Sequence, residues 1–357
     1  MGKRLFHFLL VLSLALAARA DDPVDRTVDQ TTMERSYQTV KTPFKYGVVL
    51  RGSDTEKIDC PNVFRHRGNW WMVHLAFEGR GYETRLAVSD DLLNWRPLGP
   101  ILKPAGGGWD AEQAAAGLAL VDFRWDGSAK LEKHAGRYWM SYLGGAKVGY
   151  ETPPLAVGLA NTTAPTALTG WKRALPKPIL RITDADARWF EQDTLFKSYI
   201  LHDRTRRTGH PFVMFYNARE ATNVWTERIG MAVSDDLLQW KRFGMEPVID
   251  NGPKRGISGD PQVVKIKDVW VMFYFGAFYK PKAFDTFACS RDLVNWTKWE
   301  GPHLVEPSEP WDNTFAHKPW VIRHRGVVYH FYCAVGDQGR VIALATSKEL
   351  RKPGGSN

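Results

Sequence analysis

The chain has 357 residues, a formal net charge of +9, 44% hydrophobic residues, 13% aromatic residues and three cysteines. The hydrophobic content is enough to build a large buried core, which excludes a disordered chain, and three cysteines are too few for a disulfide-built scaffold. Lys and Arg are scattered, without a basic helix or zinc module, so nucleic acid is not an expected partner.

The first twenty residues read as a secretory signal peptide. Lys3 and Arg4 precede an apolar run over 5–18, and Ala18-Arg19-Ala20 matches an A-x-A cleavage site. This run is shorter than the roughly 20 residues that a membrane span needs, although an uncleaved anchor is the alternative. Cleavage removes Lys3, Arg4 and Arg19, which lowers the net charge from +9 to +6. We therefore expect a secreted or periplasmic protein without membrane attachment.

Three further segments are expected after the signal peptide. Residues 21–36 are polar and predict a flexible arm, residues 37–350 predict a single folded domain, and residues 351–357 predict a tail. The three cysteines all lie in apolar, strand-like runs: Cys60, Cys289 and Cys333. We expect buried free thiols, with one disulfide as the alternative.

A two-part unit recurs five times in the expected domain. Its first part, an apolar strand, a polar turn and an aromatic-rich strand, occupies 60–77, 117–144, 193–218, 261–277 and 319–335. Its second part is a third strand, a Ser-x-Asp-Leu turn and a Trp, as in LAVSDDLLNW (86–95), MAVSDDLLQW (231–240) and FACSRDLVNW (287–296), with a longer variant at 156–171 and a truncated copy at 344–350. Five such units predict an all-β, five-bladed β-propeller, whose last blade residues 37–50 would complete.

The repeated turns predict their own packing. Ser and Asp side chains at such turns hydrogen-bond backbone amides. The Trp that follows is expected to pack between blades: Trp95, Trp171, Trp240 and Trp296.

The starts of the five first strands carry the residues expected of an active site, because these starts converge on one axial pocket in a propeller. Acids stand at four of them: Asp59; Asp110 or Glu112; Glu191 or Asp193; and Asp260. The fifth carries His317 and Lys318, with Asp312 just upstream. Several carboxylates around one pocket raise the pKa of at least one of them, which suits acid–base cleavage of a glycosidic bond. The alternative is that each Asp only forms a turn.

These strand starts and the Ser-x-Asp-Leu-x-x-Trp turns resemble the five-bladed β-propeller glycoside hydrolases of families 43, 62, 117 and 130, over roughly residues 45 to 350. The family 43 resemblance implies a general base, a pKa-tuning Asp and a general acid at Asp59, Asp193 and Asp260. The family 117 resemblance, with its His proton donor, points to His317. No clear match exists to the phosphate-binding cluster of family 130.

Two departures from family 43 concern the proposed acids. The general acid of that family is usually Glu, and Asp260 is shorter. Asp59 stands two residues before Pro61, whereas Asp260 stands one before Pro261. Adjacent strand positions point to opposite sides, so without a bulge these two acids would not face the channel in the same way.

Other residues near the strand starts are candidates for substrate binding. Aromatic residues just before the starts are expected to stack on sugar rings at the rim, with packing as the alternative: Trp109, Trp189, Phe190 and Trp311. Basic residues are expected to bind a substrate carboxylate or sulfate, with surface salt bridges as the alternative: Arg219, Arg255 and Lys318. Glu112 and Glu191 complete the expected binding set.

The sequence therefore predicts an exported, exo-acting glycosidase that hydrolyses a terminal bond of a plant or algal oligosaccharide or polysaccharide, including anionic ones. No cofactor is expected. A channel Ca²⁺ remains an option, although no Asp-x-Asp-x-Asp loop is present. The alternatives are a non-catalytic carbohydrate-binding propeller and a sialidase, which the turns disfavour because they lack the Gly of Ser-x-Asp-x-Gly-x-Thr-Trp.

Overall fold

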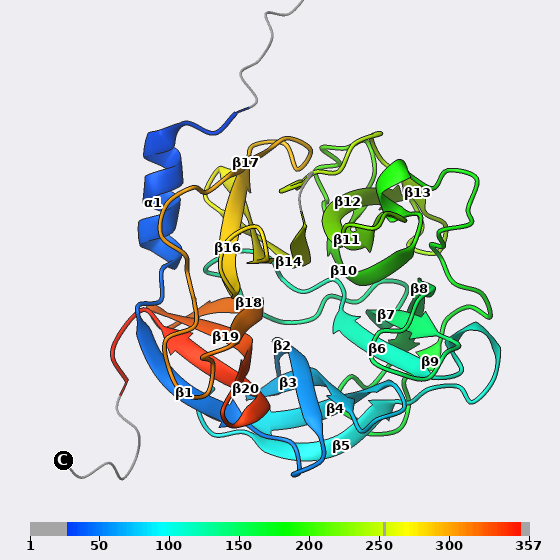
Figure 1. Ribbon diagram of the computed structural model, residues 1–357, viewed down its shortest axis with the longest axis horizontal. Coiled ribbons are helices and arrows are strands. Elements are labelled where there is room, and N and C mark those ends of the chain that lie inside the picture. The colour runs from blue at the N-terminus through cyan, green and yellow to red at the C-terminus, as the bar shows by residue number, and fades with distance from the viewer. Residues whose placement is uncertain (1–26, 253–254, 351–357) are drawn as a thin grey trace, which may run out of the picture.

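The computed structural model describes residues 27–252 and 255–350, and nearly all of its regular structure is β-strand. Figure 1 shows the strands arranged around a common centre, with the helix α1 on the outside. The all-β class is therefore confirmed, apart from this helix. The expected signal peptide and tail lie outside the described residues. Within the described part, no helix has the length and apolar character that crossing a membrane requires.

The strands form five sets of four, each strand pairing antiparallel with the next in its set. The first set is β2 (Lys57–His66), β3 (Asn69–Phe77), β4 (Tyr82–Ser89) and β5 (Arg96–Leu102). The second is β6 (Gln113–Leu118), β7 (Tyr138–Gly145), β8 (Leu155–Thr162) and β9 (Lys172–Arg173). The third is β10 (Thr194–His202), β11 (Phe212–Arg219), β12 (Thr226–Ser234) and β13 (Lys241–Arg242). The fourth is β14 (Gly256–Ile266), β15 (Val269–Ala277), β16 (Ala283–Ser290) and β17 (Trp296–Lys298). The fifth is β18 (Phe315–His324), β19 (Val327–Gly336), β20 (Gly339–Thr346) and β1 (Phe44–Leu50).

Strand β1 completes the last set, as the sequence predicted, because it pairs antiparallel with β20. Short parallel pairings join β12 to β14 and β16 to β18, so the first and third strands of these sets run in the same direction. Strand β2 packs against β18 and β20, which brings the first and last sets together. The first strands lie nearest the centre and begin at one face of the molecule, so residues at their starts are neighbours.

The Ser-x-Asp-Leu turns form the predicted hydrogen bonds. Ser89 Oγ accepts from the amides of Asp91 and Leu92 at 3.2 and 3.0 Å, and Leu92 takes a φ of 72°. The Trp95 indole donates to the carbonyl of Leu92 at 3.0 Å and lies edge-on to Phe331 of the fifth set. The same bonds recur at the turns that begin at residues 234 and 290. These Trp side chains are thus structural, as expected.

The flexible arm predicted over 21–36 is wrong for residues 30–36, which begin the helix α1 (Gln30–Val40). The Asp29 side chain caps the helix by accepting from the Thr32 amide at 2.8 Å. Met33 and Val40 are buried in a shared core, and Tyr37 stacks on Trp299 with 5.0 Å between ring centroids. Half of the buried helix positions are Thr or Ser, so no clear apolar stripe marks the helix in the sequence.

Replacing Asp29 by Ala is expected to lower the free energy of unfolding by about 1 kcal/mol, because the capping bond to the helix is lost. Urea denaturation measures this change. The matched control is Asp90→Ala at an exposed turn position, which should stay within about 0.5 kcal/mol of the parent. An equal loss in both variants would contradict a capping role for Asp29.

Candidate active site

Four of the first strands carry the same irregularity near their starts. Register shifts interrupt β2, β10, β14 and β18, and the residues before proline in three of them, Cys60, Asp260 and Lys318, have φ of 47°, 52° and 64°. A bulge leaves two consecutive residues opposite one partner residue and re-aims a side chain. Asp59 and Asp260 therefore both reach the centre, despite their different distances from proline, and Cys60 Sγ lies 3.4 Å from Asp260 Oδ2.

A cavity of about 220 Å³ lies where these strand starts converge, and all five sets contribute to its wall. Its apolar part includes Cys60, Leu143 and Phe275. Its polar residues are Glu151, Lys197, Asn217, Glu227, Asp260, His317, Lys318 and Arg340. Three of the predicted site residues, Asp260, His317 and Lys318, are thus brought together here.

Asp59 lies behind the cavity wall, fully buried, and its carboxylate is saturated with donors. Its Oδ2 atom accepts from the hydroxyls of Tyr82 and Tyr150 at 2.7 and 3.3 Å, and from Lys318 Nζ and Arg340 Nη1 at 2.9 and 2.7 Å. Burial raises the pKa of Asp59, but the two cations together hold it well below its usual range. Asp59 is therefore ionised at neutral pH and is a weak proton acceptor.

Glu227, the second residue of β12, is a buried acid that the sequence analysis did not single out. Its pKa is raised to about 8, chiefly by burial and also by the nearby Glu151 and Asp260 charges, against the opposing effects of a hydrogen bond from Trp225 and of Lys318. The Trp225 indole donates to Oε1 at 2.6 Å, and the Asn217 amide donates to Oε2 at 2.8 Å. Glu227 therefore carries a proton at neutral pH and is held in a fixed orientation.

Glu151 is the second carboxylate in the cavity that the sequence analysis missed. It lies in the loop before β8, with its Oε1 atom 3.5 Å from Lys318 Nζ and its side chain 22% exposed. Burial raises its pKa, while Lys318 favours the ionised form. Glu151 and Glu227 are thus two neighbouring carboxyl groups in different environments, the arrangement from which acid and base roles arise.

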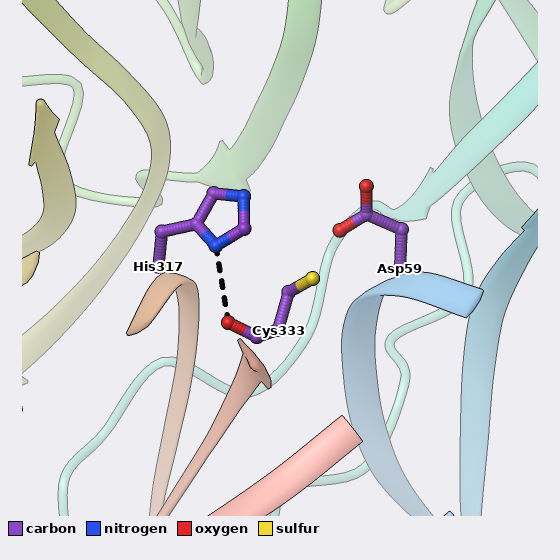
Figure 2. A group of neighbouring side chains, drawn as sticks. All are labelled: Asp59, His317 and Cys333. Carbon is purple, nitrogen blue, oxygen red and sulfur yellow. Dashed lines mark hydrogen bonds between the residues drawn. The ribbon is translucent and has the colours of Figure 1, made fainter. Parts of the chain in front are cut away.

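His317 lies beside Asp59 and Cys333 (Figure 2). Its Nδ1 atom lies 3.0 Å from the carbonyl oxygen of Cys333. A carbonyl only accepts, so Nδ1 must carry the hydrogen, and the other ring nitrogen of a neutral imidazole is then an acceptor. Burial and, to a smaller extent, the nearby Arg340 lower the pKa of His317 to about 3. A neutral ring in this tautomer does not donate a proton from Nε2, unlike the His donor that the family 117 resemblance implied.

Asp59, His317 and Cys333 each offer a ligand atom within 4.8 Å of the others. Lys318 and Arg340 already occupy the Asp59 carboxylate, and burial raises the pKa of the Cys333 thiol well above its usual range. Ca²⁺ takes oxygen ligands, and one carboxylate beside a thiol and an imidazole does not provide such a set. The group fits a hydrogen-bonded cluster better than the Ca²⁺ site considered from the sequence.

All three cysteines are buried free thiols, as expected.

Several acids near the strand starts hold outer strands in place instead of facing the cavity. They are buried, and each pairs with a cation from the fourth strand of its own set: Asp110 with Arg173, Glu191 with Arg242, and Asp312 with Lys45. Burial raises the pKa of Glu191, and Arg242 opposes this. These contacts recur in three sets, which explains why acids repeat at those positions.

The remaining charged candidates lie outside the cavity wall. Asp193 accepts from Arg219 Nε at 2.7 Å and is 28% exposed. Glu112 pairs with the exposed Arg80 at 2.7 Å. The guanidinium of Arg255 lies 4.4 Å from the ring centroid of Phe278, which lines the cavity, so Arg255 is near its mouth.

The predicted rim aromatics pack within their own sets. Trp109 stacks on Tyr142, with 5.4 Å between ring centroids. The indole nitrogens of Trp189 and Trp311 donate to Glu246 and to the Tyr332 hydroxyl, both at 3.2 Å. Phe190 is buried in the core.

Three other aromatic side chains border the cavity and are substantially exposed: Tyr150 (39%), Trp225 (45%) and Phe278 (42%).

A signal for the missed residues was present in the sequence. Third strands run in the same direction as first strands, so their starts lie at the same face of the molecule. Glu227 stands at the start of such a strand, and Glu151 shortly before another, each close behind an aromatic residue. Acids at the starts of third strands therefore belong in a search for this site.

No protein-family model matches the chain. A solved structure described as a complex of BT0996 with RGII is 46% identical, with 92% of this chain and 98% of that structure's chain covered and a TM-score of 0.88. A second solved structure, described as a glycoside hydrolase, is also 46% identical over the same shares, with a TM-score of 0.87.

More distant matches bear on the fold. A family 117 glycoside hydrolase from Zobellia galactanivorans is 14% identical over 87% of this chain and 91% of its own, with a TM-score of 0.58. A thermostable family 43 glycoside hydrolase is 16% identical over 88% of this chain and all of its own, with a TM-score of 0.59.

Among curated proteins, a 1,2-beta-oligomannan phosphorylase of a Thermoanaerobacter species is 27% identical over 150 residues. The chain spans about half the length of the curated relatives it matches.

The resemblance to families 43 and 117 is thus confirmed in the fold. At 46% identity over nearly the whole of a named glycoside hydrolase, this chain belongs to the glycoside hydrolases.

Proposed function

We propose that this enzyme is an exo-acting glycosidase in which Glu227 is the general acid and Glu151 is its partner carboxylate. The observation that carries the proposal is the pair itself: one carboxyl group protonated at neutral pH, beside a second that faces a lysine, in one cavity. Glu227 would protonate the leaving oxygen. Glu151 would either activate water or attack the sugar, and these routes give inverted and retained products.

We further propose that the five strand sets are the blades of one closed five-bladed propeller that spans residues 37–350. The packing of β2 on β18 and β20 supports closure between the first and last sets. In such a ring the first strands surround the channel, which fits the contribution of all five sets to the cavity.

The other polar residues would hold the substrate and the catalytic pair. Asp59 fixes Lys318 and Arg340 and so positions the cation that faces Glu151. Asp260, 3.4 Å from Lys197 Nζ, and His317 Nε2 would accept hydrogen bonds from sugar hydroxyls. In this proposal His317 is a binding residue rather than the acid.

The cavity supports a neutral terminal sugar as the substrate group. About 220 Å³ suits a single ring better than a chain, and exposed aromatics at its edge would stack on the next sugar. Among the residues that the structure describes, the cations lining the cavity are Lys197, Lys318 and Arg340, and each is paired with a carboxylate, so none of these three is free for a substrate acid. The relative described as a complex with RGII makes an RGII oligosaccharide our proposed substrate.

We also propose that the protein is exported, which the signal-like residues 1–20 support. Sequencing the N-terminus of protein recovered from the periplasm or medium tests this. A first residue of Asp21 is expected, and recovery of an uncleaved chain in the membrane fraction would favour the anchor alternative.

Incubating the purified enzyme with RGII oligosaccharides tests the activity. Release of one neutral monosaccharide is expected, with the anomer of the fresh product followed by NMR. Release of larger internal fragments would contradict exo action. Binding to the oligosaccharide without any release, while other glycosides are cleaved, would contradict the substrate and leave the acid assignment intact.

The rate should fall as pH rises through about 8, because Glu227 then loses the proton that it must donate. The measurement is kcat/KM against pH with a natural oligosaccharide. A Glu227→Gln variant assayed on an aryl glycoside with a good leaving group should show no such alkaline limb, since that leaving group needs no proton. An unchanged limb in this variant would assign the limb to another residue.

A further inference from the structure

The turns at the far ends of the first strands carry an exposed cation in every set. These turns join the first strand to the second, and we call their cations the basic face: Arg67, Lys133, Arg207, Lys267 and Arg325. First strands begin at the cavity and end at these turns. The basic face therefore lies on the side of the molecule opposite the cavity.

The backbone of three of these turns favours a different residue type. The pairs Arg67-Gly68, Lys267-Asp268 and Arg325-Gly326 are two-residue hairpin loops, and their first residues have φ of 49°, 53° and 49°. This left-handed conformation favours Asn, Asp or Gly. Long cations occupy a position that costs them conformational energy in three independent turns, which points to a use for the charge itself.

These charges are not neutralised within the described chain. None of Arg67, Lys267 and Arg325 forms an ion pair with any residue that the structure describes. Their field also reaches neighbouring groups. Burial lowers the pKa of His66 and His324, and Arg67 and Arg325 lower these values further. Burial and the nearby Arg207 together lower the pKa of Lys265 to about 8.

A groove of about 1250 Å³ runs between α1 and this side of the molecule. Its basic lining residues are Arg35, Arg124, Lys265, Lys267, Arg291 and Arg323. The groove also holds two acids, Asp126 and Asp268, which pair with Arg323 and Arg291. Arg124 pairs with Asp122, whereas Arg35, Lys265 and Lys267 form no ion pair with any residue that the structure describes, so the groove keeps an excess of positive charge. A groove of this kind encloses more of an extended polyanion than a flat surface does.

We propose that the basic face and its groove bind an anionic polysaccharide, a linear polyuronate, at a second site remote from the cavity. None of the exposed large apolar side chains of the described residues lies in the five turns, so the face lacks the apolar anchors of a membrane-inserting surface. A polyuronate repeats carboxylates along its chain, and the basic face repeats cations from one turn to the next, so the charges of the two are complementary. This site would keep the enzyme on an acidic polymer while the cavity takes neutral terminal sugars.

The test compares two triple variants of the full mature enzyme. Arg67→Asn/Lys267→Asn/Arg325→Asn removes three charges from the basic face, and Asn suits the left-handed turn, so folding is retained. Arg96→Asn/Lys172→Asn/Lys241→Asn removes three exposed charges from outer strands. Binding to polygalacturonate is measured by affinity electrophoresis and calorimetry at about 0.01 M and about 0.15 M salt, where the Debye lengths are roughly 30 and 8 Å.

The parent should bind polygalacturonate at low salt and more weakly at high salt. The basic-face variant should bind roughly tenfold or more weakly, the control should bind within about twofold of the parent, and all three should hydrolyse a small substrate equally. If binding to polygalacturonate weakened equally in both variants, net charge alone would explain the effect, and the proposal would be overturned. So would a parent that binds anionic phosphatidylglycerol vesicles but not polygalacturonate. Hydrolysis is measured separately, so failure of this site is distinguishable from failure of the proposed catalytic pair.

Discussion

Glu227→Gln is expected to lower kcat on natural oligosaccharides by about 10³-fold, because the amide keeps the size of the side chain and, through its oxygen, the hydrogen bond from the Trp225 indole, but it has no acidic proton to donate. Glu151→Gln should lower kcat by a comparable factor, because it removes the partner carboxylate. Steady-state kinetics measure both changes, and thermal unfolding confirms that the variants fold. Azide rescue of Glu151→Gln on an activated substrate, with the anomer of the glycosyl azide, would identify which reaction route the enzyme uses.

The matched control is Asp193→Asn, since Asp193 is the residue to which the family 43 resemblance assigns a pKa-tuning role. Its carboxylate pairs with Arg219 and does not line the cavity, so we expect most of the activity to remain. A loss as large as that of Glu227→Gln would restore Asp193 to the catalytic set and would remove the basis for the Glu151 and Glu227 pair.

Asp59→Asn should lower the free energy of unfolding by about 3 kcal/mol, because Lys318 and Arg340 then lose the only carboxylate that both of them contact among the described residues. Urea denaturation at pH 7 measures this. Asp193→Asn makes the same chemical change in a more exposed ion pair and should cost less than about 1 kcal/mol. Similar losses in the two variants would show that the buried Asp59 cluster carries no special stability.

The Asp59 effect should depend on pH in a defined direction. Its folded-state pKa lies well below the unfolded value of about 3.9, so its contribution to stability is complete above that unfolded value. The contribution is lost as pH falls from there toward the folded-state pKa. The difference between the parent and Asp59→Asn should therefore shrink below about pH 4, and a difference that grows in acid would contradict the assignment.

The repeats made the strand sets predictable, since each turn with Ser, Asp and Trp encodes its own hydrogen bonds locally. Residues 60–77 and 261–277 reveal their hairpins by alternation and by short polar turns. The sequence pattern did not predict the helix α1, because half of its buried positions are polar. Its stability comes from contacts with residues about 260 positions away, such as Trp299.

The sequence by itself determined the β class, the position of β1 in the last set and the general place where polar groups converge. Tertiary structure decided which of those groups share the cavity. Bulges turned Asp59 and Asp260 toward the same centre, and outer-strand cations drew Asp110 and Glu191 away from it. Glu227 became a candidate acid only through burial, since a pKa near 8 arises from desolvation by residues distant in the chain. Local residue order sets strands and turns, whereas the charge state of a side chain depends on neighbours that only folding supplies.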